Sequence, residues 1–161
     1  MNAQMDHRGA SGSDPATGDG AGIFVQMPDK FLRKEMAKKG IELPPEGDYG
    51  SGLVFLSPET SEREAAMQFF EHIIREEGQK FLGWRTVPVK SGILGKTSGR
   101  YEPSIRQVFI GKNPEITDAM EFERKLYIIR RRVTYGIRNN ELPNNVTDVH
   151  GNKSNSFPGS A

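Results

Sequence analysis

The sequence predicts an α/β domain in which helices cover a mixed sheet, followed by a disordered polar tail over residues 139–161. The first observation is the order of apolar and amphipathic runs, which reads strand, helix, strand, helix, strand, strand, helix. The second is size, because 161 residues with 35% hydrophobic side chains suffice for one domain with a real core. The third is the tail, which is rich in Asn, Ser, Gly and Pro and has no apolar period.

The first half of the domain is expected to alternate strand and helix. The apolar run Ile23–Met27 stops at Pro28, which predicts a buried strand. Apolar residues at helical spacing follow the proline and end at Gly40, which predicts a helix. Residues 41–51 contain several prolines and glycines and predict a connector, and Leu53–Leu56 predicts the second strand.

Two further strands are expected in the second half, at Phe81–Val89 and Ile105–Ile110. A polar stretch with several glycines separates them. Trp84 lies in the first of these strands. We expect its large apolar ring to pack in the core or against another domain rather than to stack on a ligand.

Two helices are expected where a capping pattern precedes an amphipathic run. Ser61 and Asp118 each stand three residues before a glutamate, which predicts helices ending at Gly78 and at about Arg138. The second helix carries the run Arg130–Arg132. We favour either ion pairs between this run and nearby acids or docking of the run against the missing part of the domain. The alternative is binding to nucleic acid, as an RNA-binding helix.

Composition excludes several classes of function. The net charge of +1 argues against general binding to nucleic acid or a membrane surface, which usually needs a strong basic excess. The chain has no cysteine, which rules out disulfides, thiolate metal sites and cysteine nucleophiles within it. It has neither a signal-peptide pattern nor an apolar run near the roughly 18 residues of a membrane span. We therefore expect a cytoplasmic protein with no nucleic-acid and no membrane partner.

A glycine-rich loop over residues 18–22 precedes the first expected strand. A dinucleotide site needs a strand before the glycines and a helix after them, and a P-loop needs Gly-Lys-Ser/Thr, so neither pattern fits. Asp14 and Asp19 lack the alternating acidic residues of a calcium loop. From the residues alone, the favoured interpretation is that the glycines permit close approach of two backbone segments while Asp19 satisfies turn amides.

Several separate motifs resemble one family when they are taken together. They are His7–Ala10, Thr17–Ile23, Phe81–Pro88, Pro103–Ile110 and Phe122–Arg132. In this order they resemble the glutaminase domain of glutamate synthase large subunits, a class II glutamine amidotransferase. The resemblance covers residues 1–138 and defines the expected partial domain, which leaves residues 139–161 as the tail.

The resemblance implies an N-terminal-nucleophile fold with two sheets packed face to face and covered by helices. In this family the thiolate of an N-terminal cysteine attacks the glutamine amide, and the α-amine of the same cysteine acts as the base. Arg8 and Gly9 would then support the nucleophile, and Asp19, Gly20 and Gly22 would belong to a loop near the active site. The ammonia released is used at a distant flavin site to make glutamate from 2-oxoglutarate.

The chain departs from the family pattern in the residue that carries the chemistry. It has no cysteine, and the family's later glutamine-binding motifs are absent. We expect a fragment that is inactive alone and that needs glutamine as substrate and the remainder of the large subunit as partner. No cofactor is expected in this chain, whereas the parent family uses FMN and an iron–sulfur cluster. An alternative of another class is a non-catalytic α/β module for amino-acid binding or protein interaction.

Overall fold

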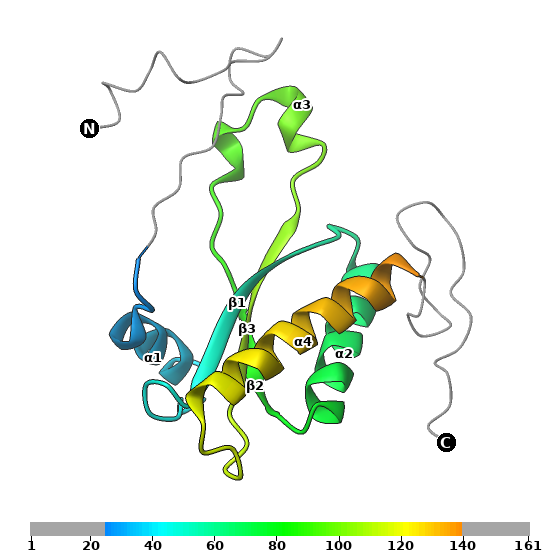
Figure 1. Ribbon diagram of the computed structural model, residues 1–161. Helices are drawn as coiled ribbons and strands as arrows, with labels where there is room; N and C mark the ends of the chain where they lie inside the picture. Colours follow the sequence, from blue (N-terminus) through cyan, green and yellow to red (C-terminus); the bar gives the residue numbers. More distant parts are fainter. Residues whose placement is uncertain (1–24, 140–161) are drawn as a thin grey trace, which may run out of the picture.

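The computed structural model describes residues 25–139, apart from the side chains of residues 97 and 98. Its centre is a three-stranded sheet with the order β1-β3-β2. The strands are β1 (Tyr49–Leu56), β2 (Lys80–Thr86) and β3 (Ser104–Gly111) (Figure 1). Both pairings are antiparallel, so the last strand in sequence lies between the two earlier ones.

The register of the sheet decides which side chains share a face. On β3, Gln107 lies opposite Leu53 of β1 and opposite Arg85 of β2. The pairing of β1 with β3 is regular throughout, whereas β2 has an irregularity between Phe81 and Gly83. Because side chains alternate along a strand, Leu53, Gln107 and Arg85 belong to one face of the sheet.

Two long helices cover the other face of the sheet. They are α2 (Thr60–Glu76) and α4 (Ala119–Arg138), which lie side by side in Figure 1. Their apolar faces pack on the sheet because hydrophobic residues recur at the helical period. The buried core there consists of Ala65, Phe69, Phe70, Ile73, Ile74, Val108, Ile110, Ile129 and Val133.

One short helix, α1 (Asp29–Ala37), packs on the opposite face, where it covers only one end of the sheet. Its buried residues Leu32 and Met36 form a second core cluster with Leu43, Tyr49 and Phe109. Between β2 and β3 the chain forms a 3-10 helix, Ser91–Ile93, and the short helix α3 (Lys96–Gly99). This connection extends beyond the sheet in Figure 1.

The predicted order of the longer helices and the strands is confirmed from α1 onward, although the 3-10 helix and α3 between β2 and β3 were not predicted. The first predicted strand is wrong in its described part. Residues 25–28 form no strand. Val25 and Met27 are 59% and 39% exposed, and the Met27 carbonyl accepts a hydrogen bond from the Asp29 amide at the entry to α1. An apolar run becomes a strand only when another strand pairs with it, and none of the described strands lies beside these residues.

The sheet and the helix caps also differ in detail from expectation. A mixed sheet was expected, and the pairs among residues 25–139 are all antiparallel. Asp118 caps α4 as predicted, because its carboxylate accepts a hydrogen bond from the Met120 amide at 3.0 Å. The Ser61 cap is wrong, since α2 starts one residue earlier, at Thr60, after Glu59.

The predicted tail, residues 139–161, lies outside the described residues except for Asn139, so that boundary stays a prediction. In the described part of the chain, no helix is both long enough and apolar enough to cross a membrane.

Candidate functional site

The residues that the sequence assigned to the nucleophile and its loop lie at the start of the chain. Arg8, Gly9, Asp19, Gly20 and Gly22 all fall outside the described residues, so the structure brings none of them to a defined position. Their roles stay predictions. The described chain starts just after them and leads directly into α1, which packs on the less covered face of the sheet. That face is therefore the place to look for the rest of a site.

A strip of hydrogen-bonded polar side chains crosses this face. The Gln107 amide nitrogen donates to the Ser51 hydroxyl at 3.0 Å, and the Arg85 guanidinium donates to the Gln107 amide oxygen at 3.3 Å. The same guanidinium donates to the Glu35 carboxylate of α1 at 3.1 Å. The strip thus runs from β1 across β3 and β2 to α1.

Arg85 is the centre of the strip and is held from several sides. Arg85 is 8% exposed, and its guanidinium lies 5.3 Å from the centre of the Phe31 ring. Hydrogen bonds from Lys38 and then from Arg85 hold the pKa of Glu35 below its usual value. A carboxylate kept ionised in this way positions the arginine and is a poor general acid near neutral pH.

A second group of contacts fixes α1 to the start of β1. The Tyr49 hydroxyl donates to the Asp29 carboxylate at 2.8 Å, and Arg33 donates to the same carboxylate at 2.9 Å. Burial and the bond to Asp29 raise the pKa of Tyr49 to about 12. The hydrogen bond from Arg33, followed by that from Tyr49, lowers the pKa of Asp29. These groups anchor the helix because each is already committed to a structural partner.

Beyond the polar strip, the same face exposes large apolar side chains. Leu53 and Phe55 of β1 are 58% and 65% exposed, and Phe31 of α1 is 50% exposed. Their neighbour on the other face, Val54, packs against the core beneath α2 and α4. Apolar side chains gathered on one side of a sheet are typical of a surface that packs against more protein.

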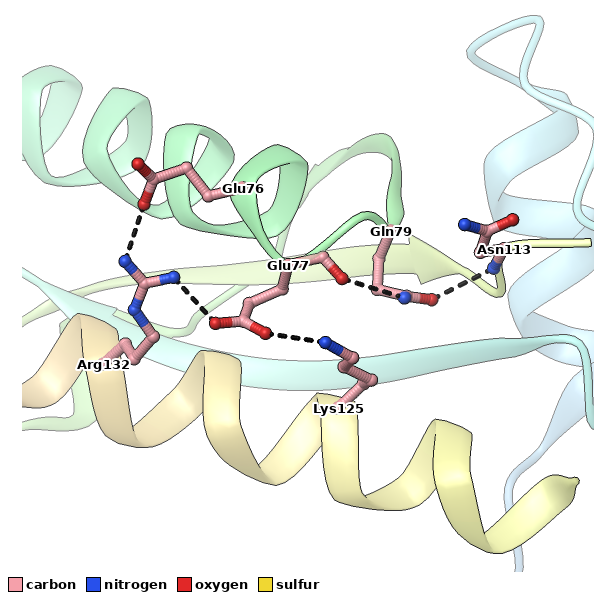
Figure 2. A network of polar contacts seen from close by, with 6 residues as sticks. All are labelled: Glu76, Glu77, Gln79, Asn113, Lys125 and Arg132. Atoms are coloured by element: carbon pink, nitrogen blue, oxygen red, sulfur yellow. Dashed lines mark hydrogen bonds and ion pairs between the residues drawn. The ribbon is translucent and has the colours of Figure 1, made fainter. Parts of the chain in front are cut away.

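The opposite face is closed by charge as well as by apolar packing. Glu77, at the end of α2, accepts hydrogen bonds from Lys125 at 3.0 Å and Arg132 at 2.7 Å, both on α4 (Figure 2). Arg132 also donates to Glu76 at 2.6 Å. Burial alone would raise the pKa of Glu77, but the bonds from Arg132 and Lys125 outweigh it and lower the pKa. The predicted pairing of the run Arg130–Arg132 with nearby acids is confirmed for Arg132.

Trp84 is packed on this closed face, as the sequence predicted. The centre of its ring lies 5.5 Å from the centre of the Phe70 ring in an edge-to-face arrangement, and its indole nitrogen donates to the Glu71 carboxylate at 3.0 Å. His72 of α2 lies 3.3 Å from the Glu76 carboxylate on the helix surface. Within residues 25–139, no three acidic or histidine side chains come together in a way that would hold a metal ion.

Comparison with known proteins identifies the family to which the chain is similar. A family model described as glutamine amidotransferases class-II matches residues 1–149. The chain is 50% identical over 132 residues to the glutamate synthase (NADPH) large chain of Bacillus subtilis, which covers 82% of this chain and 9% of that protein. It is 37% identical over 126 residues to ferredoxin-dependent glutamate synthase 2 of Synechocystis, covering 78% of this chain and 8% of that protein.

A third relative, the glutamate synthase (NADH) of Schizosaccharomyces pombe, is 38% identical over 138 residues, covering 81% of this chain and 6% of that protein. The chain therefore spans less than a tenth of the length of these three relatives. The matched family is the one that the sequence motifs predicted.

Proposed function

Because the chain belongs to the class II glutamine amidotransferases, we propose that it works as part of the glutaminase domain of a glutamate synthase large chain. The observation that carries the proposal is the pairing of this family match with a half-covered sheet. One face is closed by α2 and α4, and the other ends in the exposed side chains of Leu53 and Phe55. A domain of two facing sheets needs such a face for its second layer.

The reaction proposed for the parent domain is the hydrolysis of glutamine to glutamate and ammonia. A cysteine thiolate attacks the side-chain amide carbon, ammonia leaves, and water then cleaves the thioester. This chain has no cysteine, so the thiolate has to come from another segment of the parent protein. Arg8 and Gly9 are proposed to support that nucleophile, and Asp19, Gly20 and Gly22 to form a loop beside it.

The described residues would serve this reaction by positioning. The strip formed by Glu35, Arg85, Gln107 and Ser51 holds the sheet and α1 in one arrangement through hydrogen bonds and an ion pair. Since residues 25–28 lead into α1, the strip also holds the point at which the described residues begin, which in sequence is just after the glycine loop. A rigid support of this kind limits the positions that a catalytic loop can adopt.

The iron–sulfur cluster of the parent family does not fit the residues of this chain. Iron–sulfur clusters are held by cysteine thiolates, and the sequence has none. We therefore assign the cluster to other parts of a large chain, and no step here involves the cluster or FMN.

Glutamine hydrolysis by the isolated 161-residue chain tests the inactive-alone part of the proposal. We expect ammonia release equal to that of an unrelated control protein. Turnover well above that control would contradict it, because some other nucleophile would then be acting.

A chimera tests the positive part of the proposal. Residues 25–138 would replace the matching segment of the Bacillus subtilis large chain, which is 50% identical. We expect the chimera to retain glutamine hydrolysis, and a matched chimera with the relative's nucleophilic cysteine replaced by alanine to lose it. A folded but inactive first chimera would contradict the assignment of this segment to the glutaminase domain.

A further inference from the structure

The outer edge of β1 is unpaired within the described part of the chain. The sheet order is β1-β3-β2, so β1 and β2 each pair with β3 on one side only. An unpaired edge presents a row of backbone N–H and C=O groups that can accept another strand. The two edge strands, β1 and β2, differ in how readily such pairing could occur.

The edge strand β2 has features that disfavour pairing with a further strand. It includes the charged residues Lys80 and Arg85, and its ladder is interrupted between Phe81 and Gly83. The edge strand β1 carries none, since its sequence YGSGLVFL has no charge and no proline and its eight residues stay in regular register. Soluble proteins seldom leave such an edge open, so β1 has the properties of a strand with a further neighbour.

A groove of about 710 Å³ lies along this edge, between β1 and α4. Its wall and floor are mostly apolar, including Leu126, Ile129, Val133 and Ile137 of α4 with Val54 and Leu56 of β1. Charged residues at its rim include Glu123, Arg130 and Arg138. A strand added beside β1 would direct every second side chain into this groove.

We propose that β1 pairs with an extended strand from a part of the parent large chain outside these 161 residues, and that alternate apolar side chains of that strand fill the groove beneath α4. The inference rests on the proposed function, because it takes the chain to work within a larger protein. The relatives supply ample further chain, since this sequence spans only 6–9% of their length.

Two other occupants fit the groove less well. A second copy of this chain would offer its own β1, in which two of the four groove-facing positions, Gly50 and Gly52, have no side chain to fill the space. The segment 140–161 contains two prolines, and its apolar residues Leu142, Val146, Val149 and Phe157 never recur at alternate positions. A strand that fills a groove needs that alternation.

The test uses the whole chain and a synthetic octapeptide of alternating valine and threonine, matched to the eight residues of β1. Amide hydrogen exchange, read by NMR, reports both edges of the sheet in one sample. We expect the outward amides of β1 to slow by about tenfold or more when the peptide binds, while those of β2 stay unchanged. A control peptide with the same side chains and N-methylated alternate amides should have no effect, because it cannot pair.

Two neighbouring substitutions distinguish peptide binding in the groove from non-specific binding elsewhere on the protein. Val54→Lys puts a charge into the groove and should abolish the slowing. Leu53 also borders the groove, but its side chain lies on the other face of the sheet, opposite Gln107, so Leu53→Lys should not abolish it. Persistent protection of the β3 amides shows that each variant is folded. Equal loss in both variants, or a β2 response as large as that of β1, would overturn the proposal.

Two results with no peptide present would also overturn it. One is β1 amides that are already protected in the monomeric free chain, which would make a segment of this chain the occupant. The other is concentration-dependent dimerisation through β1, which would make it a second copy. None of these readouts involves glutamine hydrolysis, so failure here would leave the proposed glutaminase role standing.

Discussion

The two faces of the sheet have the same three strands beneath them and very different surroundings. One is sealed by α2 and α4, with a core in which Ile74 and Ile129 are 0% exposed. The other is covered at one end by α1 and leaves Phe55 65% exposed at the other. Within the described residues, one face of the sheet is therefore covered along its length, and the other is covered only at the end where α1 packs.

The largest expected effect is on the sealed face. Ile129→Ala should lower the free energy of unfolding by about 2–5 kcal/mol, because it removes buried contacts and leaves a cavity. Leu53→Ala is the matched control on the open face, where the side chain is 58% exposed, and should change stability by about 0.5 kcal/mol or less. Chemical denaturation measures both. Similar losses of unfolding free energy in the two variants would contradict the stated difference between the two faces.

A substitution at the end of the sheet that α1 covers should also lower stability. Gly83 has a φ of +155°, and an added Cβ would lie 2.7 Å from the end of the Ile41 side chain. Gly83→Ala should therefore cost about 1–3 kcal/mol in thermal unfolding. Gly52→Ala is the control, since the nearest atom to its added Cβ is 3.8 Å away. A neutral Gly83→Ala variant would contradict the close packing of α1 on this end.

The charges that join α2 to α4 predict a pH effect on the sealed face. The pKa of Glu77 is lowered from 4.5 in the folded protein, so its stabilisation is present above that pH and is lost as the pH falls through the folded value. Glu77→Gln should cost about 1 kcal/mol near neutral pH. The gap between the variant and the natural protein should close below pH 4.5. A gap that persists in acid would mean that the ion pairs do not cause it.

A smaller effect is expected at the anchor of α1. The pKa of Tyr49 is raised from 10.0 to about 12, so its contribution to stability is complete below pH 10.0 and is lost as the pH approaches 12. In an absorbance titration, one of the four tyrosines should ionise late, and Tyr49→Phe should remove that late step. An unchanged titration curve would place Tyr49 in water rather than beneath α1.

Local patterns predicted the elements of the sealed face well. The long apolar period of α4 and its Asp118 cap depend on residues close in sequence, and both are confirmed. The strand predicted through Met27 is wrong in its described part, because a strand forms only where a second strand pairs with it. The strand order β1-β3-β2 was likewise out of reach, since pairing between distant segments leaves little trace in either segment alone.

The candidate site shows the same division. The motif residues Arg8 and Asp19 were found by resemblance, and their placement stays a prediction. The polar strip was missed, because Arg85 and Glu35 are 50 residues apart in sequence and meet only through the fold. An arginine and a glutamine that point to the same side of neighbouring strands were the one available signal, and it needed the register to be known.

The most direct test of the account is the binding of an apolar fluorescent dye to the open face. The natural chain should bind the dye while fully folded, and the double variant Leu53→Lys with Phe55→Lys should lose most of the signal without a lower unfolding midpoint. Tyr101→Lys, at a loop position that is 81% exposed, should leave the signal unchanged. A double variant that binds dye as before, or that unfolds, would contradict the claim that this face awaits a second layer of protein.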